Sequence, residues 1–248
     1  MKKIGVIIQA RLGSTRLPSK VLLPLGEKTI IEHIYDRCSI LNIPIVVATT
    51  TNSNDDPLVD LLESKRILYY RGSENDVLNR FIGAASTFGL THIVRVCSDN
   101  PFLDVAYLKE LVSAFEKKQN VDYVSYQFNN KPTILSHFGV FAEIVSLDAL
   151  CRIYSQFELM PGYKEHVTIG VYSNPEIFKI ELLPLLEDYS MFDNIRLTVD
   201  TPGDYEIAKN IMVNIELKDA RLMELCTYLS EQEPLLIEMK KSITLNIK

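Results

Sequence analysis

The amino-acid sequence predicts an α/β fold with a mostly parallel central sheet and helices on both faces of the sheet. Short apolar runs of strand length alternate with amphipathic stretches of helical length through the first half of the chain, a pattern typical of parallel strands joined by right-handed crossovers. With 248 residues, the chain is long enough to bury a complete core around such a sheet. A loop of small and basic residues directly follows the first apolar run, at the position where α/β proteins usually bind nucleotides.

In the first half, five apolar runs are predicted to be strands, at residues 4–8, 45–49, 67–70, 92–96 and 122–126. Helices are expected between them at residues 29–41, at 55–64, from the 71–80 segment to residues 88–89, and at 105–118. The first helix follows from apolar residues at helical spacing. The second begins with Asp55-Asp56-Pro57, which suits a first helical turn, and Gly89 marks the end of the third.

The second half is less regular. Strands are predicted at residues 138–144, 178–182 and 195–199. Helices are predicted at residues 146–154 with Ser146 as the N-cap, and at 161–171, 201–215, 219–229 and 234–240. Because no repeat or linker interrupts the chain, we expect one domain over residues 1–248.

The composition narrows the classes of protein and of ligand. Hydrophobic residues make up 47% and charged residues 23% of the chain, as in ordinary soluble globular proteins. The formal net charge is −6, whereas nucleic-acid binding requires an excess of basic residues to meet the phosphate backbone. We therefore expect no nucleic-acid partner, and a small anionic ligand suits the local basic loop better.

The apolar runs and the cysteines indicate where in the cell the protein works. No apolar run reaches the roughly 20 residues that span a bilayer, and the first run meets Gln9 and Arg11 too early for a signal peptide. The four cysteines and four histidines are scattered, without metal-ligand or redox spacing. We expect a cytoplasmic protein with free thiols, no membrane partner and no zinc site.

The loop after the first strand reads Gln-Ala-Arg-Leu-Gly-Ser-Thr-Arg-Leu-Pro-Ser-Lys over residues 9–20. Its small residues leave backbone amides open to an anion, and Arg11, Arg16 and Lys20 are spaced to clamp a polyphosphate from several sides. It is neither a Walker loop nor a Gly-x-Gly-x-x-Gly turn. On composition alone, a solvated basic loop is an equally good interpretation.

The order of residues in this loop resembles the opening signature of the cytidylyltransferases that activate acidic sugars. The spore coat polysaccharide biosynthesis branch, related to the KDO and acylneuraminate cytidylyltransferases, is most similar. The resemblance implies a Rossmann-like nucleotidyltransferase fold in which the loop binds the triphosphate of CTP, through Ala10, Arg11, Gly13, Ser14, Arg16 and Lys20. It also implies that an irregular segment, near residues 127–185, binds the acceptor and packs against a second copy in a homodimer.

A second constellation follows the fourth predicted strand, in the segment 95–102. Asp99 is its acidic residue, and Mg²⁺ prefers one or two carboxylates together with phosphate oxygens and water. The segment is similar to the family turn Gly-Asp-x-Pro-Leu, whose aspartate is a metal ligand, although Ser98 and Phe102 replace the glycine and leucine. The alternative is that Asp99 caps its own loop.

A third constellation spans residues 196–206, where a predicted strand ends in Asp200. By itself this aspartate suits the N-cap of the next helix. The string resembles the family motif Val-Asp-Thr-Pro-x-Asp-Tyr-Glu, which implies that Asp200 supplies the second carboxylate of the magnesium site. No spacing rule brings Asp99 and Asp200 together; only the resemblance implies that they meet.

Further matches concern the nucleoside and the acceptor. The resemblance implies that Arg71 and Ser73 approach the cytosine and ribose, and that Glu143 and His166 lie in the acceptor region. In that region relatives often carry two aspartates where this chain has Phe138 and Phe141. We expect the loss of these carboxylates to change which acceptor is bound, or to abolish its binding.

Three functions fit these observations. The first is a CTP-dependent cytidylyltransferase that joins CMP to an anionic sugar or related acceptor and releases pyrophosphate, with catalytic residues Arg11, Arg16, Lys20, Asp99 and Asp200. The second is a nucleotide-binding module without turnover, suggested by the altered acceptor region. The third is a related nucleotidyltransferase that uses another nucleoside triphosphate, because the phosphate loop does not by itself select the base.

Overall fold

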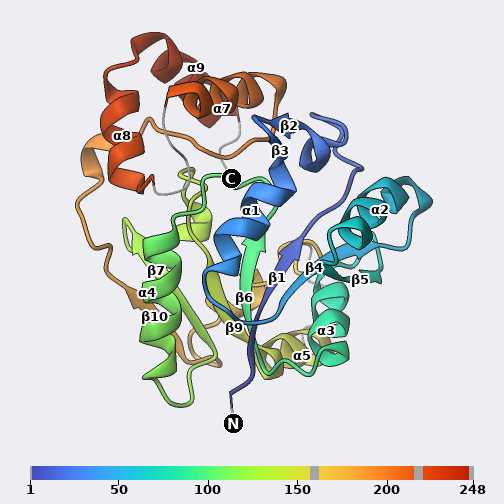
Figure 1. The fold of residues 1–248 in the computed structure, drawn as a ribbon. Coiled ribbons are helices and arrows are strands. Elements are labelled where there is room, and N and C mark those ends of the chain that lie inside the picture. Colours follow the sequence, from blue (N-terminus) through green and yellow to red (C-terminus); the bar gives the residue numbers. More distant parts are fainter. Residues whose placement is uncertain (1, 157–161, 215–219, 246–248) are drawn as a thin grey trace.

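A broad sheet runs through the centre of the protein (Figure 1) in a computed structural model that describes residues 2–156, 162–214 and 220–245. Within these ranges eight strands join the sheet, seven of them in the order β10-β7-β9-β6-β1-β4-β5, while β8 pairs with β7. The strands are β1 (Ile4–Gln9), β4 (Ile45–Thr50), β5 (Leu68–Gly72), β6 (His92–Cys97), β7 (Tyr123–Phe128), β8 (Lys131–Pro132), β9 (Glu143–Ser146) and β10 (Ile180–Leu183). A separate hairpin joins β2 (Pro24–Leu25) to β3 (Lys28–Thr29).

Most neighbouring strands are parallel. β1 pairs in parallel with β4 and with β6, β4 with β5, and β7 with β10. β9 runs antiparallel between β6 and β7, and therefore returns the chain across the sheet. The parallel strands β1, β4, β5 and β6 end along one edge, since Gln9 faces Cys97 and Thr50 faces Gly72 in the register.

The strands are apolar on both faces, which is why they read as continuous hydrophobic runs. Alternate residues of a strand point to opposite faces, and the buried residues divide accordingly into two clusters. Val6 and Ile8 belong to one cluster and Ile7 to the other, and β6 divides in the same way, with Val94 in the first and Ile93 in the second.

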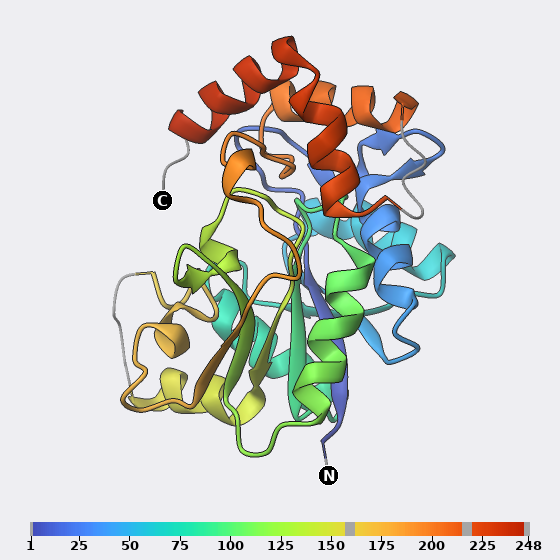
Figure 2. The ribbon, with the colours of Figure 1, turned by 90° about the vertical axis from the view of Figure 1, so that its left-hand side faces the viewer.

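Helices cover both faces (Figures 1 and 2). The first cluster receives apolar side chains from α1 (Ile30–Ser39), α2 (Asp56–Ser64) and α4 (Val105–Glu116), and the second receives them from α3 (Val77–Thr87), α5 (Leu147–Gln156) and α6 (Ile169–Tyr172). The five strands and four helices predicted in the first half are confirmed, with ends that shift by a few residues. Ser146 accepts the amide of Ala149 at 3.0 Å and so caps α5 as expected.

The second half departs from the predictions in three places. Residues 138–142 are not a strand, since β9 begins only at Glu143. Of the helix predicted at 161–171, Pro161 lies outside the described residues, and 162–168 form turns before the short α6. Residues 195–199 form no strand. The Val199 amide donates to the Asp99 carbonyl at 2.8 Å, and the Leu197 amide donates to the Phe138 carbonyl at 3.1 Å. These hydrogen bonds are too few to form a β-ladder.

Three further helices lie together over the edge where the parallel strands end (Figures 1 and 2). They are α7 (Pro202–Asn214), α8 (Leu222–Ser230) and α9 (Glu233–Leu245). Asp104, which is buried, caps α4 through the amides of Ala106 and Tyr107 and also accepts the Leu222 amide at 2.6 Å. Because α8 is tied to α4 in this way, the carboxyl-terminal helices belong to the main core, and Met239 of α9 is fully buried in it.

Two expectations from composition bear on this structure. The four cysteines lie in the described residues and none forms a disulfide; Cys38 and Cys226 are buried. None of the helices in the described ranges combines the length and the apolar character that a bilayer crossing demands.

Candidate functional site

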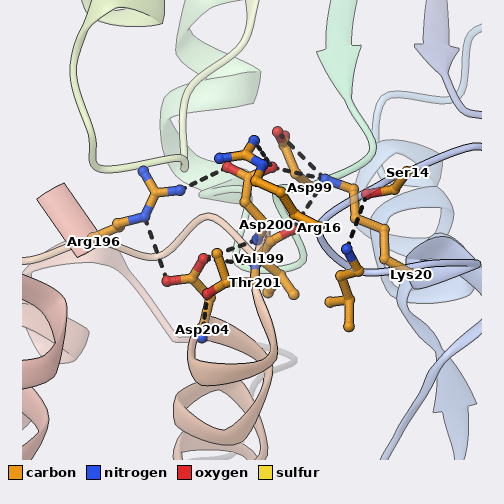
Figure 3. Close-up of polar contacts among 10 residues, drawn as sticks. Ser14, Arg16, Lys20, Asp99, Arg196, Val199, Asp200, Thr201 and Asp204 are labelled. Carbon is orange, nitrogen blue, oxygen red and sulfur yellow. Dashed lines mark hydrogen bonds and ion pairs between the residues drawn. The ribbon is translucent and has the colours of Figure 1, made fainter. Parts of the chain in front are cut away.

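Lys20 joins two aspartates that lie a hundred positions apart in the chain (Figure 3). Its ammonium nitrogen donates to Asp200 Oδ1 at 2.9 Å and lies 3.9 Å from Asp99 Oδ2. It also donates to the carbonyl of Val199 at 3.1 Å. The phosphate-loop lysine and both carboxylates therefore meet at the edge where β1 and β6 end, in the arrangement that the resemblance implied.

Asp200 is held on both carboxylate oxygens. Oδ1 faces Lys20 and, at 3.4 Å, the guanidinium of Arg16, while Oδ2 accepts a 2.6 Å hydrogen bond from Arg196. Burial disfavours the charged carboxylate, but the charges of Lys20 and Arg196 outweigh burial and lower the pKa of Asp200 below its ordinary value. The group is thus an anion at neutral pH.

The first turn of α7 is capped by other residues than Asp200. The Asp204 amide donates to Thr201 Oγ1 at 3.2 Å, and Asp204 Oδ2 accepts the amides of Thr201 and Asp200, each at 3.0 Å. This is the reciprocal arrangement of a capping box. The N-cap interpretation of Asp200 is therefore wrong, because its side chain is directed to the cationic groups instead.

The loop over residues 10–20, which is predicted to bind phosphate, is held by hydrogen bonds to Ala48 of β4 and to Asp55, the residue directly before α2. Asp55, which is only 2% exposed, accepts the Leu12 amide at 2.6 Å and the Thr49 hydroxyl at 3.2 Å, and it also accepts from Thr50. Sequence reasoning assigned Asp55 only to a helix start. Nothing in the spacing signals its second role, because Leu12 lies 43 positions away.

The turn inside the loop uses some of its own donors. The Ser14 amide donates to the Leu12 carbonyl at 2.8 Å, and Ser14 Oγ accepts the Leu17 amide at 3.3 Å. The sequence predicted that amides of this loop are open to an anion, but the Ser14 amide is already used in the turn. Ser19, the residue before Lys20, adopts a left-handed conformation (φ 54°) that turns the chain into the short 3₁₀ turn at Lys20–Leu22.

The two arginines of the loop lie at its exposed rim. The side chain of Arg11 is 45% exposed and lies 3.5 Å from Glu74 Oε1, and that of Arg16 is 53% exposed. Ala10 is buried and its amide bonds to Ala48, so its side chain is part of the core. Gly13 is exposed beside Glu74, where an added Cβ would lie 3.3 Å from Oε1.

The two residues predicted to approach the nucleoside are engaged locally. Arg71 donates to the carbonyls of Thr50 at 2.8 Å and Asn52 at 2.9 Å, so it fixes the loop after β4. Ser73 is exposed, and its hydroxyl accepts the Asp76 amide at 3.1 Å. Contact of Arg71 and Ser73 with a base stays a prediction.

The two predicted acceptor residues lie in different environments. Glu143 is 1% exposed, and its carboxylate accepts from Arg95 at 2.6 Å and Thr168 at 2.7 Å and from the hydroxyl of Tyr123. Its oxygens are thus occupied inside the sheet. His166 is exposed in the turns before α6. Their part in acceptor binding stays a prediction, and the position of Glu143 does not support it.

The two phenylalanines that replace family aspartates belong to the core. Phe138 is fully buried and lies 5.1 Å from the ring of Phe128, and Phe141 is 5% exposed and lies 5.0 Å from the ring of Tyr107. Edge-to-face pairs of this kind stabilise a packed interior. Their side chains are therefore part of the interior, and the expected effect of the lost carboxylates on acceptor binding stays a prediction.

The donor set at Lys20 fits a hard divalent cation. Mg²⁺ is usually held by one or two carboxylates together with substrate phosphates and water, and Asp99 and Asp200 already converge on one positive group. Among the described residues, no cluster of three or more histidine, cysteine or acidic side chains would hold an ion without such additional ligands. The pair is therefore suited to an ion that arrives with a phosphate.

Comparison with known proteins agrees with this geometry. Residues 5–241 match the family model described as Cytidylyltransferase. The chain is similar to the spore coat polysaccharide biosynthesis protein SpsF of Bacillus subtilis, with 32% identity over 238 residues that cover 93% of this chain and 95% of SpsF.

Two solved structures share the fold. A cytidylyltransferase from Leptospira borgpetersenii superposes with a TM-score of 0.81 at 29% identity, over 96% of this chain and 98% of that one. CMP:2-keto-3-deoxy-manno-octonic acid synthetase in complex with CTP gives a TM-score of 0.64 at 14% identity, over 86% and 99%, which shows a shared fold. The Rossmann-like nucleotidyltransferase fold is thereby confirmed. The chain is a nucleotidyltransferase, and it belongs to the cytidylyltransferase family.

Proposed function

We propose that this enzyme uses CTP and Mg²⁺ to join CMP to an anionic sugar or related acceptor, with release of pyrophosphate. The observation that carries the proposal is the convergence of Lys20 on Asp99 and Asp200 beside the exposed Arg16. Support for CTP comes from the family description and from the related synthetase whose structure holds CTP.

In the proposed reaction an acceptor oxygen attacks the α-phosphorus of CTP, and the bond from that phosphorus to the oxygen bridging to the β-phosphate breaks. Pyrophosphate leaves with the bonding electron pair. Such chemistry requires alignment and charge neutralisation more than covalent help. Arg11, Arg16 and Lys20 supply positive charge for the β- and γ-phosphates and for the leaving pyrophosphate.

Asp99 and Asp200 would hold the magnesium ion. Bound there, the ion supplies charge neutralisation at the phosphate that the nucleophile approaches. Lys20 contacts both carboxylates, so its ammonium group is also within reach of phosphate oxygens held at the same place.

The acceptor is proposed to be an acidic sugar for a surface polysaccharide, because the similar SpsF is named for spore coat polysaccharide biosynthesis. Burial of Phe138 and Phe141 removes two positions from the side chains that face such a ligand. An acceptor panel that includes acidic sugars, sugar phosphates and phosphonates would identify the substrate class.

The test is pyrophosphate release from CTP with Mg²⁺ and that panel. We expect Lys20→Ala and Asp99→Asn each to reduce turnover about 100-fold or more, since each removes a charge placed for the transferred group. Lys28→Ala and Asp36→Asn are matched controls, because this exposed ion pair lies apart from the site and contributes little. Turnover near the wild-type rate in the Lys20 or Asp99 variant would contradict the proposed roles.

The base is tested separately by thermal shift with each of the four nucleoside triphosphates and Mg²⁺. A ligand that binds only the folded state raises the melting temperature, and we expect CTP to raise it most. A larger rise with another triphosphate would overturn the choice of CTP, and binding of CTP without any pyrophosphate release would indicate a binding module.

A further inference from the structure

We propose that Arg196 is a positioning residue that holds Asp200 so that a single carboxylate oxygen, Oδ1, faces the ion and the nucleotide. The inference rests on the proposed function and adds a residue that the sequence did not assign to the site. Arg196 touches neither Lys20 nor Asp99 in the contacts of the described residues, so it would act only through Asp200 (Figure 3).

The two oxygens of Asp200 have separate partners. Arg196 is 7% exposed, and one of its terminal nitrogens donates to Oδ2 at 2.6 Å. Lys20 and Arg16 approach Oδ1 instead, at 2.9 Å and 3.4 Å. The charge-assisted bond on Oδ2 is short, and such bonds are about twice as strong as neutral ones. Oδ1 is therefore the oxygen on the side of the loop cations Lys20 and Arg16.

Arg196 also forms an ion pair with a second carboxylate, although no hydrogen bond joins its Nε to that group. Its buried Nε lies 3.5 Å from Oδ1 of Asp204, whose side chain is 3% exposed. Oδ2 of Asp204 accepts the backbone amides of Asp200 and Thr201. One planar guanidinium thus links the side chain of Asp200 to the turn that fixes the backbone of Asp200, and rotation of the Asp200 carboxylate would break this link.

The arrangement has a consequence for the ion. A carboxylate with both oxygens free can bind a cation through both, as Ca²⁺ tolerates, whereas Mg²⁺ requires near-octahedral geometry with closely set ligands. When Arg196 occupies Oδ2, Asp200 offers one oxygen only. Partners that orient a metal ligand typically change metal affinity 10–100-fold when they are removed. Arg196 should therefore favour Mg²⁺ over Ca²⁺.

The experiment measures CTP binding by calorimetry at a series of Mg²⁺ or Ca²⁺ concentrations, without acceptor and without turnover. Arg196→Met keeps the length of the side chain and removes its charge and donors. We expect the Mg²⁺ concentration for half-maximal CTP binding to rise about tenfold or more, while the Ca²⁺ requirement rises less. Arg152→Met is the matched control, since Arg152 on α5 pairs with Asp148 of the same helix and with Asp122 before β7, away from the site.

The possible results separate failure of this inference from failure of the proposed function. An unchanged Mg²⁺ requirement in folded Arg196→Met, equal to that of Arg152→Met, would overturn the inference. If Arg196→Met does not fold, Arg196→Lys replaces it; the lysine keeps the charge but lacks the planar fork, so we expect a smaller rise, and no change would again overturn the inference. Wild-type protein that binds no CTP with Mg²⁺ would overturn the proposed function, and the inference with it.

Discussion

At the scale of single residues, Asp55 shows how a buried carboxylate can shape a phosphate loop. Its charge is met by a backbone amide from the loop and by donors of Thr49 and Thr50 at the end of β4. A carboxylate accepts from all of these at once, whereas an amide side chain presents one oxygen and one donor group. The identity of the residue therefore matters more than its shape.

We predict that Asp55→Asn lowers the free energy of unfolding by about 2–3 kcal/mol, because a buried donor of the loop loses its acceptor. The affinity for CTP should fall as well, since the loop residues from Arg11 to Lys20 lose their anchor. Urea unfolding and calorimetry check the two effects. Asp56→Asn is the control, because Asp56 is half-exposed and pairs only at the surface with Arg71. Equal stability of the two variants would refute the anchoring role.

The candidate site divides into residues that the sequence could supply and residues that it could not. Lys20, Asp99 and Asp200 came from ordered motifs, and the structure brings them together. Asp55 and Arg196 act through contacts with those motifs; Arg196 stands at the start of the 196–206 segment but before the family motif, and no pattern assigns either residue a role in the site. Glu143 was read as a ligand-binding acid, although Arg95 neutralises it in the interior; such pairing depends on strands that are distant in the chain.

At the scale of elements, α1 begins with a capping box made by residues that are close together in the sequence. Thr29 and Glu32 form a capping box, in which the Thr29 amide donates to Glu32 at 2.8 Å. Burial raises the pKa of Glu32, but the bond to Lys65 and those from Thr29 outweigh burial and hold the pKa at about 2, against an ordinary value of 4.5. The ionised cap therefore stabilises the folded state.

We predict that Glu32→Gln lowers the free energy of unfolding by about 1 kcal/mol at neutral pH, because glutamine keeps the capping-box contact but removes the negative charge that pairs with Lys65 at the helix N-terminus. A folded pKa below the unfolded one gives stability that is present above about pH 4.5 and is lost as the pH falls toward 2. The difference in the free energy of unfolding between the wild type and Glu32→Gln should therefore become smaller at acidic pH. Unfolding curves from neutral to acidic pH check this, with exposed Glu27→Gln as control; a difference that widens in acid would contradict it.

Helices and strands whose apolar residues follow a helical or strand period could be predicted from the sequence. Segments whose structure depends on contacts with distant residues could not. Strands β1, β4, β6 and β7 bury side chains in both hydrophobic clusters, so their apolar runs are visible without a partner. Residues 195–199 are also largely apolar. They do not form a strand, because they make one backbone hydrogen bond to Asp99 and one to Phe138 in place of a continuous ladder. Residues 138–142 likewise pack aromatic rings in place of pairing as a strand.

At the scale of the whole molecule, the predicted contact between two copies concerns one segment of the surface. The segment near residues 127–185 was predicted to contact a second copy, and it exposes large apolar side chains at Leu135 (41%) and Ile177 (39%). The two side chains give this prediction specific positions at which a charge can be introduced.

We predict that light scattering gives twice the 28.2 kDa mass of the chain. Leu135→Asp and Ile177→Asp should each shift the population toward monomer, because a charge buried at a contact is costly. Ile237→Asp on α9 is the control, since Ile237 is 51% exposed and lies outside the segment. A monomeric wild type, or dissociation by the control alone, would contradict the assignment of this surface.

The joining of Lys20 to Asp200 spans 180 positions, and this separation has a consequence for protein synthesis. At about 5–20 residues per second, the amino-terminal loop is synthesised roughly 10 to 40 seconds before the distant aspartate. An interrupted translation product that stops before Asp200 would contain every described strand of the sheet but would lack one of the two aspartates that Lys20 contacts. Nucleotide binding that requires Asp200 would then stabilise only those chains that extend past this residue.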